Sequence, residues 1–140
     1  MRNRTRSREC ALQLLYQYEQ TSERDEDWVD NFWRQLKLDE GETTAIPEIR
    51  DYAAVILNSV IEKKDELDRI IEASADHWAI ERMALVDRNI LRIGTYEIRF
   101  NDDIPTNVAI NESIELGKKY GDSETSRFVN GILDKVAKSQ

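Results

Sequence analysis

Cysteine and histidine are almost absent from this sequence. Cys10 is the only cysteine and His77 the only histidine among the 140 residues. An intramolecular disulfide cannot form, and a zinc site built from cysteine and histidine ligands cannot be assembled. A reducing cytoplasm is therefore the expected compartment. We expect Cys10 to be a small buried residue of the first helix rather than a nucleophile, and we expect no metal site.

Glycine and proline are also scarce, with five glycines and two prolines in the chain. Few tight turns can be built from them, which favours helices over a strand-rich sandwich or barrel. The sequence contains no glycine-rich phosphate loop, no dinucleotide-binding glycine pattern and no serine-centred elbow. The scarcity of turn residues predicts an all-α protein. The missing motifs argue against small-molecule nucleotide chemistry, so we expect no cofactor, and they offer no candidate catalytic residue.

Long hydrophobic runs are missing as well, so no segment is expected to span a membrane. The apolar residues 11–16 are interrupted by Gln13 and do not form the core of a signal peptide. The arginine-rich start also suits a mitochondrial transit peptide, but the same segment contains Glu9 and Glu19. We therefore expect a cytoplasmic protein, with an organellar location as the alternative.

The residues that are present indicate a soluble globular chain with a heavily ionised surface. Hydrophobic residues make up 40% of the sequence and charged residues 34%. A chain of 140 residues can bury one sizeable core and is too short for two ordinary ones. We expect one domain over residues 1–140, with a basic N-terminal arm at 1–8 and a helical body at 9–140.

Charge is sorted along the chain. The net charge of −8 combines +4 in residues 1–8, −14 in residues 9–116 and +2 in residues 117–140. Basic ends on an acidic body indicate a surface for a polyanion such as nucleic acid. The alternative is a basic arm that is merely solvated.

Apolar spacing predicts a compact bundle of about six or seven helices. In residues 5–20, for example, Ala11, Leu14, Leu15 and Tyr18 recur at the spacing of one helix face. Further helices are predicted at 28–36, at 80–100 and at 108–120, the last ended by a left-handed Gly121. A helix with Pro47 in its first turn is predicted to start at 44 or 45, a shorter one is capped by Asp65, and the last starts at 122 or 123. Residues 38–44 are predicted to be a loop.

Arg2, Arg4, Arg6 and Arg8 occupy every second position. Guanidinium groups make bidentate contacts with phosphate and stack on bases, which suits single-stranded nucleic acid. Side chains two residues apart on a helix point about 200° apart, so the four can share one face only if these residues are extended. We therefore expect an extended arm that becomes ordered on its ligand.

A second basic segment combines cations with aromatic rings. Lys118, Lys119 and Tyr120 precede a loop, and Arg127 and Phe128 begin the last helix. Stacking together with positive charge is the chemistry of RNA recognition. Core packing of Phe128 and a structural contact of Tyr120 are the alternatives.

Several separate motifs together resemble one family. They are RSRECALQLLY at 6–16, VDRNILRIGTYE at 86–97, IP at 104–105, VAINESIELGK at 108–118 and FVNGILD at 128–134. With these motifs, the sequence resembles the transcription antitermination factor NusB family over nearly its whole length, and residues 21–80 match mainly in helical pattern. The resemblance implies an RNA-binding fold of two small helical subdomains in a bacterial or organellar protein without catalytic activity.

The resemblance also implies partners: boxA-type single-stranded RNA, bound together with the ribosomal protein NusE, and, indirectly, the transcribing RNA polymerase complex on ribosomal RNA operons. By position, Arg4, Arg6, Arg8, Arg127 and Phe128 correspond to RNA-binding residues, and we add Lys118, Lys119 and Tyr120 from their chemistry. Glu124 stands where an RNA-contacting aspartate is usual. Tyr16 and Asp87 correspond to residues facing NusE, and Asp87 stands where a glutamate is usual.

Two alternatives to this function stay open at this point. The chain could be a non-catalytic helical scaffold or homodimer that acts through protein contacts. It could also be a stand-alone RNA-recognition module related to the N-terminal domains of RNA methyltransferases. RNA binding separates the scaffold from the other two.

Overall fold

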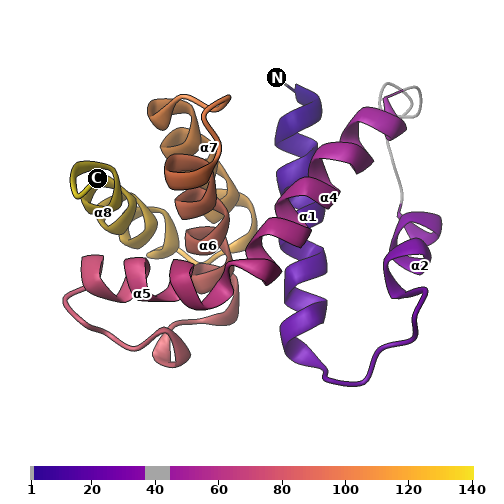
Figure 1. Ribbon diagram of the computed structural model, residues 1–140, viewed down its shortest axis with the longest axis horizontal. Helices are drawn as coiled ribbons and strands as arrows, with labels where there is room; N and C mark the ends of the chain where they lie inside the picture. The colour runs from indigo at the N-terminus through magenta and orange to yellow at the C-terminus, as the bar shows by residue number, and fades with distance from the viewer. Residues whose placement is uncertain (1, 37–44) are drawn as a thin grey trace. The chain divides into compact units, whose positions relative to one another are not determined.

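The computed structural model describes residues 2–36 and 45–140, and these residues form seven α-helices, one short 3-10 helix and no strand. The elements are α1 (Arg2–Gln20), α2 (Trp28–Gln35), α4 (Ile46–Glu62), α5 (Lys64–Ser74), η1 (Ile80–Arg82), α6 (Leu85–Phe100), α7 (Thr106–Tyr120) and α8 (Thr125–Lys138) (Figure 1). The all-α prediction is confirmed. The loop predicted at 38–44 lies outside the described residues.

The chain divides into two compact units, and the division falls within α4. Unit 1 is Met1–Leu57 and contains α1, α2 and most of α4. Unit 2 is Asn58–Gln140 and contains α5 to α8 together with η1. The two helical subdomains expected from the resemblance are therefore present.

In unit 1, α1 begins earlier than predicted. It starts at Arg2 rather than at residue 5, so the prediction of an extended arm is wrong for residues 2–8. The first turns of α1 lie beside the start of α4: the Ser7 hydroxyl is 2.9 Å from the carbonyl oxygen of Ile49, and the Asn3 side-chain amide donates to Glu48 at 2.7 Å (Figure 1). These contacts give the polar side chains of the first turns partners that an isolated arm would lack.

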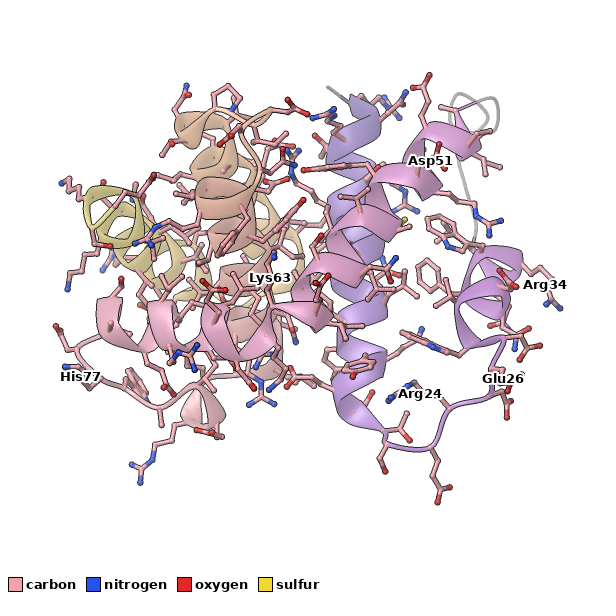
Figure 2. All side chains as sticks on the ribbon, viewed as in Figure 1. Arg24, Glu26, Arg34, Asp51, Lys63 and His77 are labelled. Atoms are coloured by element: carbon pink, nitrogen blue, oxygen red, sulfur yellow. The ribbon has the colours of Figure 1, made fainter. Side chains whose placement is uncertain are left out.

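Aromatic side chains connect α1 and α2 within unit 1. The ring centroids of Tyr18 and Trp28 are 6.2 Å apart, and those of Phe32 and Trp33 are 5.2 Å apart. Arg24 lies near the end of α1, where its Nη1 donates to the Tyr18 carbonyl oxygen at 2.9 Å (Figure 2). Tyr18 belongs to the same predicted helix face as Leu14 and Leu15, but unlike them it is partly exposed.

In unit 2, α6 is the central helix and packs against α5, α7 and α8. All residues from Asn89 to Ile98 are buried, so this part of α6 has no solvent-facing side. Several of the buried residues are polar, and their side chains must find partners inside the unit. Because this part of α6 is enclosed, it offers no side chain to a ligand at the surface.

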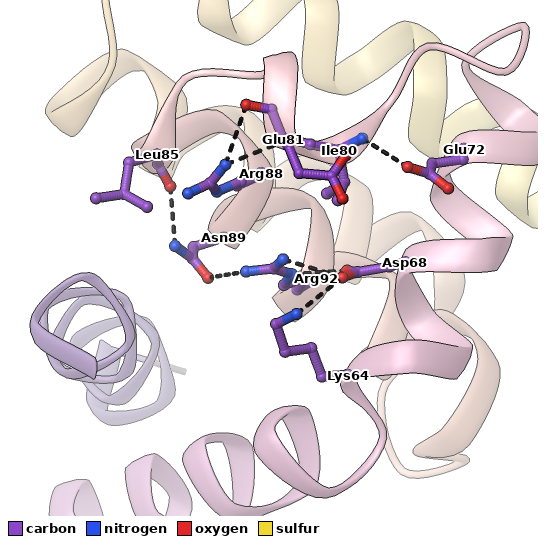
Figure 3. Close-up of polar contacts among 9 residues, drawn as sticks. All are labelled: Lys64, Asp68, Glu72, Ile80, Glu81, Leu85, Arg88, Asn89 and Arg92. Carbon is purple, nitrogen blue, oxygen red and sulfur yellow. Dashed lines mark hydrogen bonds and ion pairs between the residues drawn. The ribbon is translucent and has the colours of Figure 1, made fainter. Parts of the chain in front are cut away.

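A buried ion pair joins α5 to α6. Nε and Nη2 of Arg92 donate to the two carboxylate oxygens of Asp68 at 2.7 and 3.0 Å, and Nη1 donates to Asn89 at 3.0 Å (Figure 3). Lys64 reaches the same carboxylate at 3.4 Å. Arg92 is 2% exposed, so its charge is balanced almost entirely by protein groups. This geometry fixes the register between the two helices.

The single helix predicted over 80–100 is wrong. Residues Ile80–Arg82 form η1, Met83 and Ala84 are extended with ψ of 148° and 145°, and α6 begins at Leu85. The backbone N–H of Ile80 donates to the Glu72 carboxylate at 2.6 Å, and Nη1 of Arg88 lies 3.4 Å from the Ile80 carbonyl oxygen (Figure 3). These side-chain contacts hold η1 against α5 and α6, and apolar spacing cannot reveal them.

Other helix ends also differ from the prediction. The N-cap of α5 is Lys63, and Asp65 lies within the first turn. Gly121 ends α7 with φ of −93°, which is not left-handed; an added Cβ would instead lie 2.3 Å from Oγ1 of Thr125. The last helix begins at Thr125, later than predicted. Pro47 lies in the first turn of α4 as predicted.

Candidate nucleic-acid interface

The N-terminal arginines lie on α1, where helical geometry separates them into two pairs. Arg4 and Arg8 are one turn apart, and so are Arg2 and Arg6, whereas neighbouring arginines point away from each other. Arg4 and Arg8 share the ring of Tyr52 on α4, with guanidinium carbons 4.8 and 5.7 Å from its centroid. Cation–π contacts of this kind orient guanidinium groups. Because of the helical spacing, the four arginines do not form one row along α1.

These arginines also differ in exposure. Arg2 is exposed and Arg4 is partly exposed, whereas Arg8 is only 1% exposed. Arg6 donates to the carboxylate of Glu9 at 2.9 Å, and 15% of its side chain is exposed. An RNA contact by Arg8 requires its side chain to leave this position. The RNA-binding roles of Arg4, Arg6 and Arg8 stay predictions.

Tyr16 and Cys10 lie on the same helix in different environments. Cys10 is completely buried, which agrees with its expected place in the core. Tyr16 is 36% exposed, which leaves part of a large amphipathic ring at the surface. Tyrosine is common at protein interfaces because it combines an apolar ring with a polar tip. The role of Tyr16 toward NusE stays a prediction.

The end of α7 carries the first basic segment of unit 2. Lys118 and Lys119 are exposed in the last turn, where the helix dipole favours positive charge. Nζ of Lys119 lies 5.5 Å from the centroid of the Tyr120 ring, and Lys118 pairs with Glu115 at 3.3 Å. Surface pairs of this kind are weak, so the Lys118 ammonium can exchange Glu115 for another anion.

The start of α8 presents the second segment. Arg127 is exposed and Phe128 is partly exposed. The Phe128 ring meets the ring of Trp78 edge to face, with centroids 5.8 Å apart and planes at 73°. Trp78 is itself 50% exposed. The two rings and the neighbouring guanidinium form an exposed aromatic and cationic surface, the combination that favours nucleobases.

The backbone after α5 places Trp78 at the surface. Asp76 and His77 follow α5 with backbone φ angles of 54° and 63°. These angles lie in the left-handed region, which residues other than glycine rarely adopt. The His77 N–H donates to the carbonyl oxygen of Glu72 at 2.8 Å and so closes the end of α5 (Figure 2 labels His77). Conformations of this kind are stabilised by their surroundings and occur often at functional sites.

A pocket of about 370 Å³ lies on one side of the Trp78–Phe128 pair. We call it the Asp87 pocket, and its lining includes Trp78, Arg82, Asp87, Glu124, Arg127 and Phe128. The structure therefore brings Asp87, predicted to face NusE, together with Arg127 and Phe128, predicted to face RNA. Glu124 is exposed at its rim, and its backbone N–H donates to Asp122 at 2.9 Å.

The electrostatics of Asp87 depend on its burial and on two neighbouring side chains. Burial raises the pKa of Asp87 above its ordinary value of 3.8, and the nearby charge of Asp122 raises it further. A hydrogen bond from the Thr125 hydroxyl, at 2.8 Å, lowers the pKa and offsets part of this effect. The carboxylate is thus partly desolvated and held by α8, and it is available to a donor from a partner.

Sequence reasoning missed Trp78, Arg82 and Asp122, which also line the Asp87 pocket. The available signal was Trp78, a large aromatic residue within a polar segment before a predicted helix. The position of Trp78 at the surface depends on the left-handed turn at Asp76 and His77 and on the helix break at Met83. The interaction of Trp78 with Phe128 joins segments fifty residues apart in sequence, and no local pattern encodes such a contact.

The predicted RNA-binding residues fall into two sets. Arg4, Arg6 and Arg8 belong to unit 1, and the set from Lys118 to Phe128 belongs to unit 2.

Within the described residues, no helix is sufficiently long and apolar to cross a membrane. The same residues contain no group of three or more histidine, cysteine, aspartate or glutamate side chains placed to hold a metal ion.

Comparison with known proteins identifies the family. The model of the NusB family matches residues 5–138. The chain is 44% identical over 137 residues to the transcription antitermination protein NusB of Bdellovibrio bacteriovorus, with 97% of this chain and 96% of that protein covered. It is 46% identical over 133 residues to the protein of the same name from Desulforudis audaxviator, with 95% and 91% covered.

Solved structures agree with the sequence matches. The structure of T. maritima NusB superimposes with a TM-score of 0.79 at 34% identity, covering 98% of this chain and 92% of that one. A structure of the antitermination factors NusB and NusE in complex with double-stranded RNA gives a TM-score of 0.81 at 26% identity, covering 100% and 99%. The chain therefore belongs to the NusB family.

Proposed function

We propose that this protein is a transcription antitermination factor that binds boxA-type RNA together with NusE and thereby supports processive transcription of ribosomal RNA operons. The observation that carries the proposal is the 44% identity, across 97% of the chain, to a protein named transcription antitermination protein NusB. Residues 1–140 act as one functional domain, and the site of action is the bacterial cytoplasm, where transcription takes place. The function needs no catalysed reaction and is carried by surfaces.

Charge and geometry support a division of labour between RNA and protein. Arg127, Phe128 and the lysines at the end of α7 offer cations beside aromatic rings for RNA. Asp87 and the net charge of −14 in residues 9–116 suit a basic partner such as a ribosomal protein. Tyr16 adds an exposed ring for the protein partner. RNA polymerase is contacted through this complex.

A gel-shift titration with boxA-type RNA, with and without NusE, tests the proposal. We expect weak binding of RNA alone, tighter binding with NusE, and an affinity that falls as salt rises, because phosphate contacts release counterions. An unrelated RNA of equal length is the control. Equal affinity for both RNAs in the presence of NusE would contradict sequence-specific recognition, and no dependence on RNA would favour the protein-only scaffold.

A further inference from the structure

A second hollow lies on the other side of the Trp78–Phe128 pair. We call it the Gly131 groove. It has a volume of about 290 Å³, and its lining includes Trp78, Arg127, Phe128, Gly131 and Lys135. Phe128, Gly131 and Lys135 are spaced three and four residues apart and therefore lie along one face of α8. Trp78, Arg127 and Phe128 line both hollows and separate this groove from the Asp87 pocket.

Gly131 is exposed in the interior of α8, where nothing in the described part of the chain requires a glycine. A Cβ added at Gly131 would meet no described atom within 4 Å, whereas a Cβ added at Gly94 would lie 2.6 Å from Leu133. Glycine weakens a helix interior relative to alanine. A bare backbone at the floor of a groove is useful when a ligand must approach closely.

The charges of the two hollows differ. Asp87, Asp122 and Glu124 outnumber the two arginines at the Asp87 pocket, so an anionic strand is repelled there. At the Gly131 groove, Arg127 and Lys135 face one acid, Asp76. The Lys135–Asp76 pair is 3.7 Å long with 57% and 92% of its side chains exposed, so it is weak and Lys135 can move to a phosphate.

We propose that the Gly131 groove holds one unpaired nucleotide of the bound RNA, with its base on Trp78 and its phosphate at Lys135 and Arg127. An edge-to-face pair covers less ring surface than a stacked pair, which leaves room for a base on Trp78. The groove is at the small end of ligand pockets, which hold about 300–1,000 Å³. This inference rests on the proposed function, because it names a subsite for the same RNA.

Filling the floor of the groove tests the role of Gly131. Gly131→Ala and Gly131→Gln add increasing bulk and strengthen the helix, so neither variant should unfold. We expect the thermal midpoint to be unchanged or raised in both, and the affinity for boxA-type RNA with NusE to fall about tenfold or more in Gly131→Gln and less in Gly131→Ala. The matched control is Asn130→Ala, an exposed neighbour outside both hollows that strengthens the same helix.

Trp78 provides an independent readout. Base stacking on an aromatic ring is worth roughly a 5- to 150-fold change in affinity, so Trp78→Ala should weaken RNA binding within that range and Trp78→Phe should retain much of it. RNA should quench the tryptophan fluorescence of the wild-type protein. Trp78→Phe should lose that quenching, although Trp28 and Trp33 remain.

The outcomes separate this proposal from the function on which it rests. If the wild-type protein binds boxA-type RNA but the Gly131 and Trp78 variants bind it equally well, the groove is not an RNA subsite and the proposal is overturned. If these variants lose NusE while RNA binding persists, the groove is a protein-binding site and the proposal is again overturned. If the wild-type protein binds no RNA even with NusE, the proposed function itself fails.

Discussion

Removing the carboxylate of Asp68 is expected to destabilise unit 2 strongly. Arg92 is 2% exposed and donates two hydrogen bonds to Asp68, at 2.7 and 3.0 Å. Asp68→Ala therefore removes the carboxylate that accepts two hydrogen bonds from this buried guanidinium. Breaking a buried pair from one side costs about 3–5 kcal/mol. Because 12% of the Asp68 side chain is exposed, water can reach the site, and we expect the lower end of this range.

Thermal and urea unfolding followed by circular dichroism measures this loss. The expected fall in the thermal midpoint is of the order of 10 °C. Asp134→Ala is the matched control, because Asp134 pairs with Lys138 at 3.0 Å on the surface, where 54% and 76% of the two side chains are exposed. Its loss should stay below about 1 kcal/mol.

A double variant distinguishes unbalanced charge from lost packing. Asp68→Leu with Arg92→Met replaces the buried pair with apolar side chains and should recover most of the stability lost in Asp68→Ala, because neither charge of the pair then stays buried. If the double variant is as unstable as the single one, packing rather than charge explains the loss. If Asp68→Ala costs less than about 1 kcal/mol, the pair behaves like a surface contact and the reasoning is refuted.

Three further predictions concern the candidate interface. Burial raises the pKa of Asp87, so the ionised carboxylate destabilises the folded state once the pH exceeds the ordinary value of 3.8. Asp87→Asn should therefore raise the melting temperature at neutral pH and give no gain at acid pH. The same variant should weaken NusE binding in titrations. Arg4→Ala should reduce the salt slope of RNA binding by about one at unchanged melting temperature, whereas Arg8→Ala should lower the melting temperature because Arg8 is buried; equal effects would contradict this distinction. Gly121→Ala should cost about 1–3 kcal/mol in urea unfolding, because its Cβ would lie 2.3 Å from Oγ1 of Thr125; unchanged stability would contradict the clash.

Much of the fold could be predicted from the sequence because apolar spacing reports which helix face is buried. The buried residues Leu14, Leu15 and Val129 follow this rule, and scarcity of glycine and proline left little room for other structure. The break between η1 and α6 could not be predicted, because apolar spacing reports neither the carboxylate of Glu72, which comes from outside the segment, nor the contact of the Arg88 guanidinium with the Ile80 carbonyl oxygen.

The candidate site was predictable only in part. Arg127 and Phe128 were predicted from their chemistry and from the resemblance, because cations beside rings form a local pattern, and their RNA-binding role stays a prediction. The segment from Arg2 to Arg8 was predicted to be extended, whereas it forms the first turns of α1, which contact α4 through Ser7. Trp78 and Gly131 were missed, since an exposed ring and an unobstructed backbone acquire meaning only from the surface around them.

The Thr125 hydroxyl lies within hydrogen-bonding distance of two carboxylates, Asp87 at 2.8 Å and Asp122 at 3.2 Å. A hydroxyl carries a single hydrogen and can donate to only one of them at a time. The carboxylate that does not receive this hydrogen, either Asp87 or Asp122 in the turn that leads to Phe128, keeps acceptor capacity for another donor. At any time, one acceptor in the lining of the Asp87 pocket is therefore available to a donor from outside.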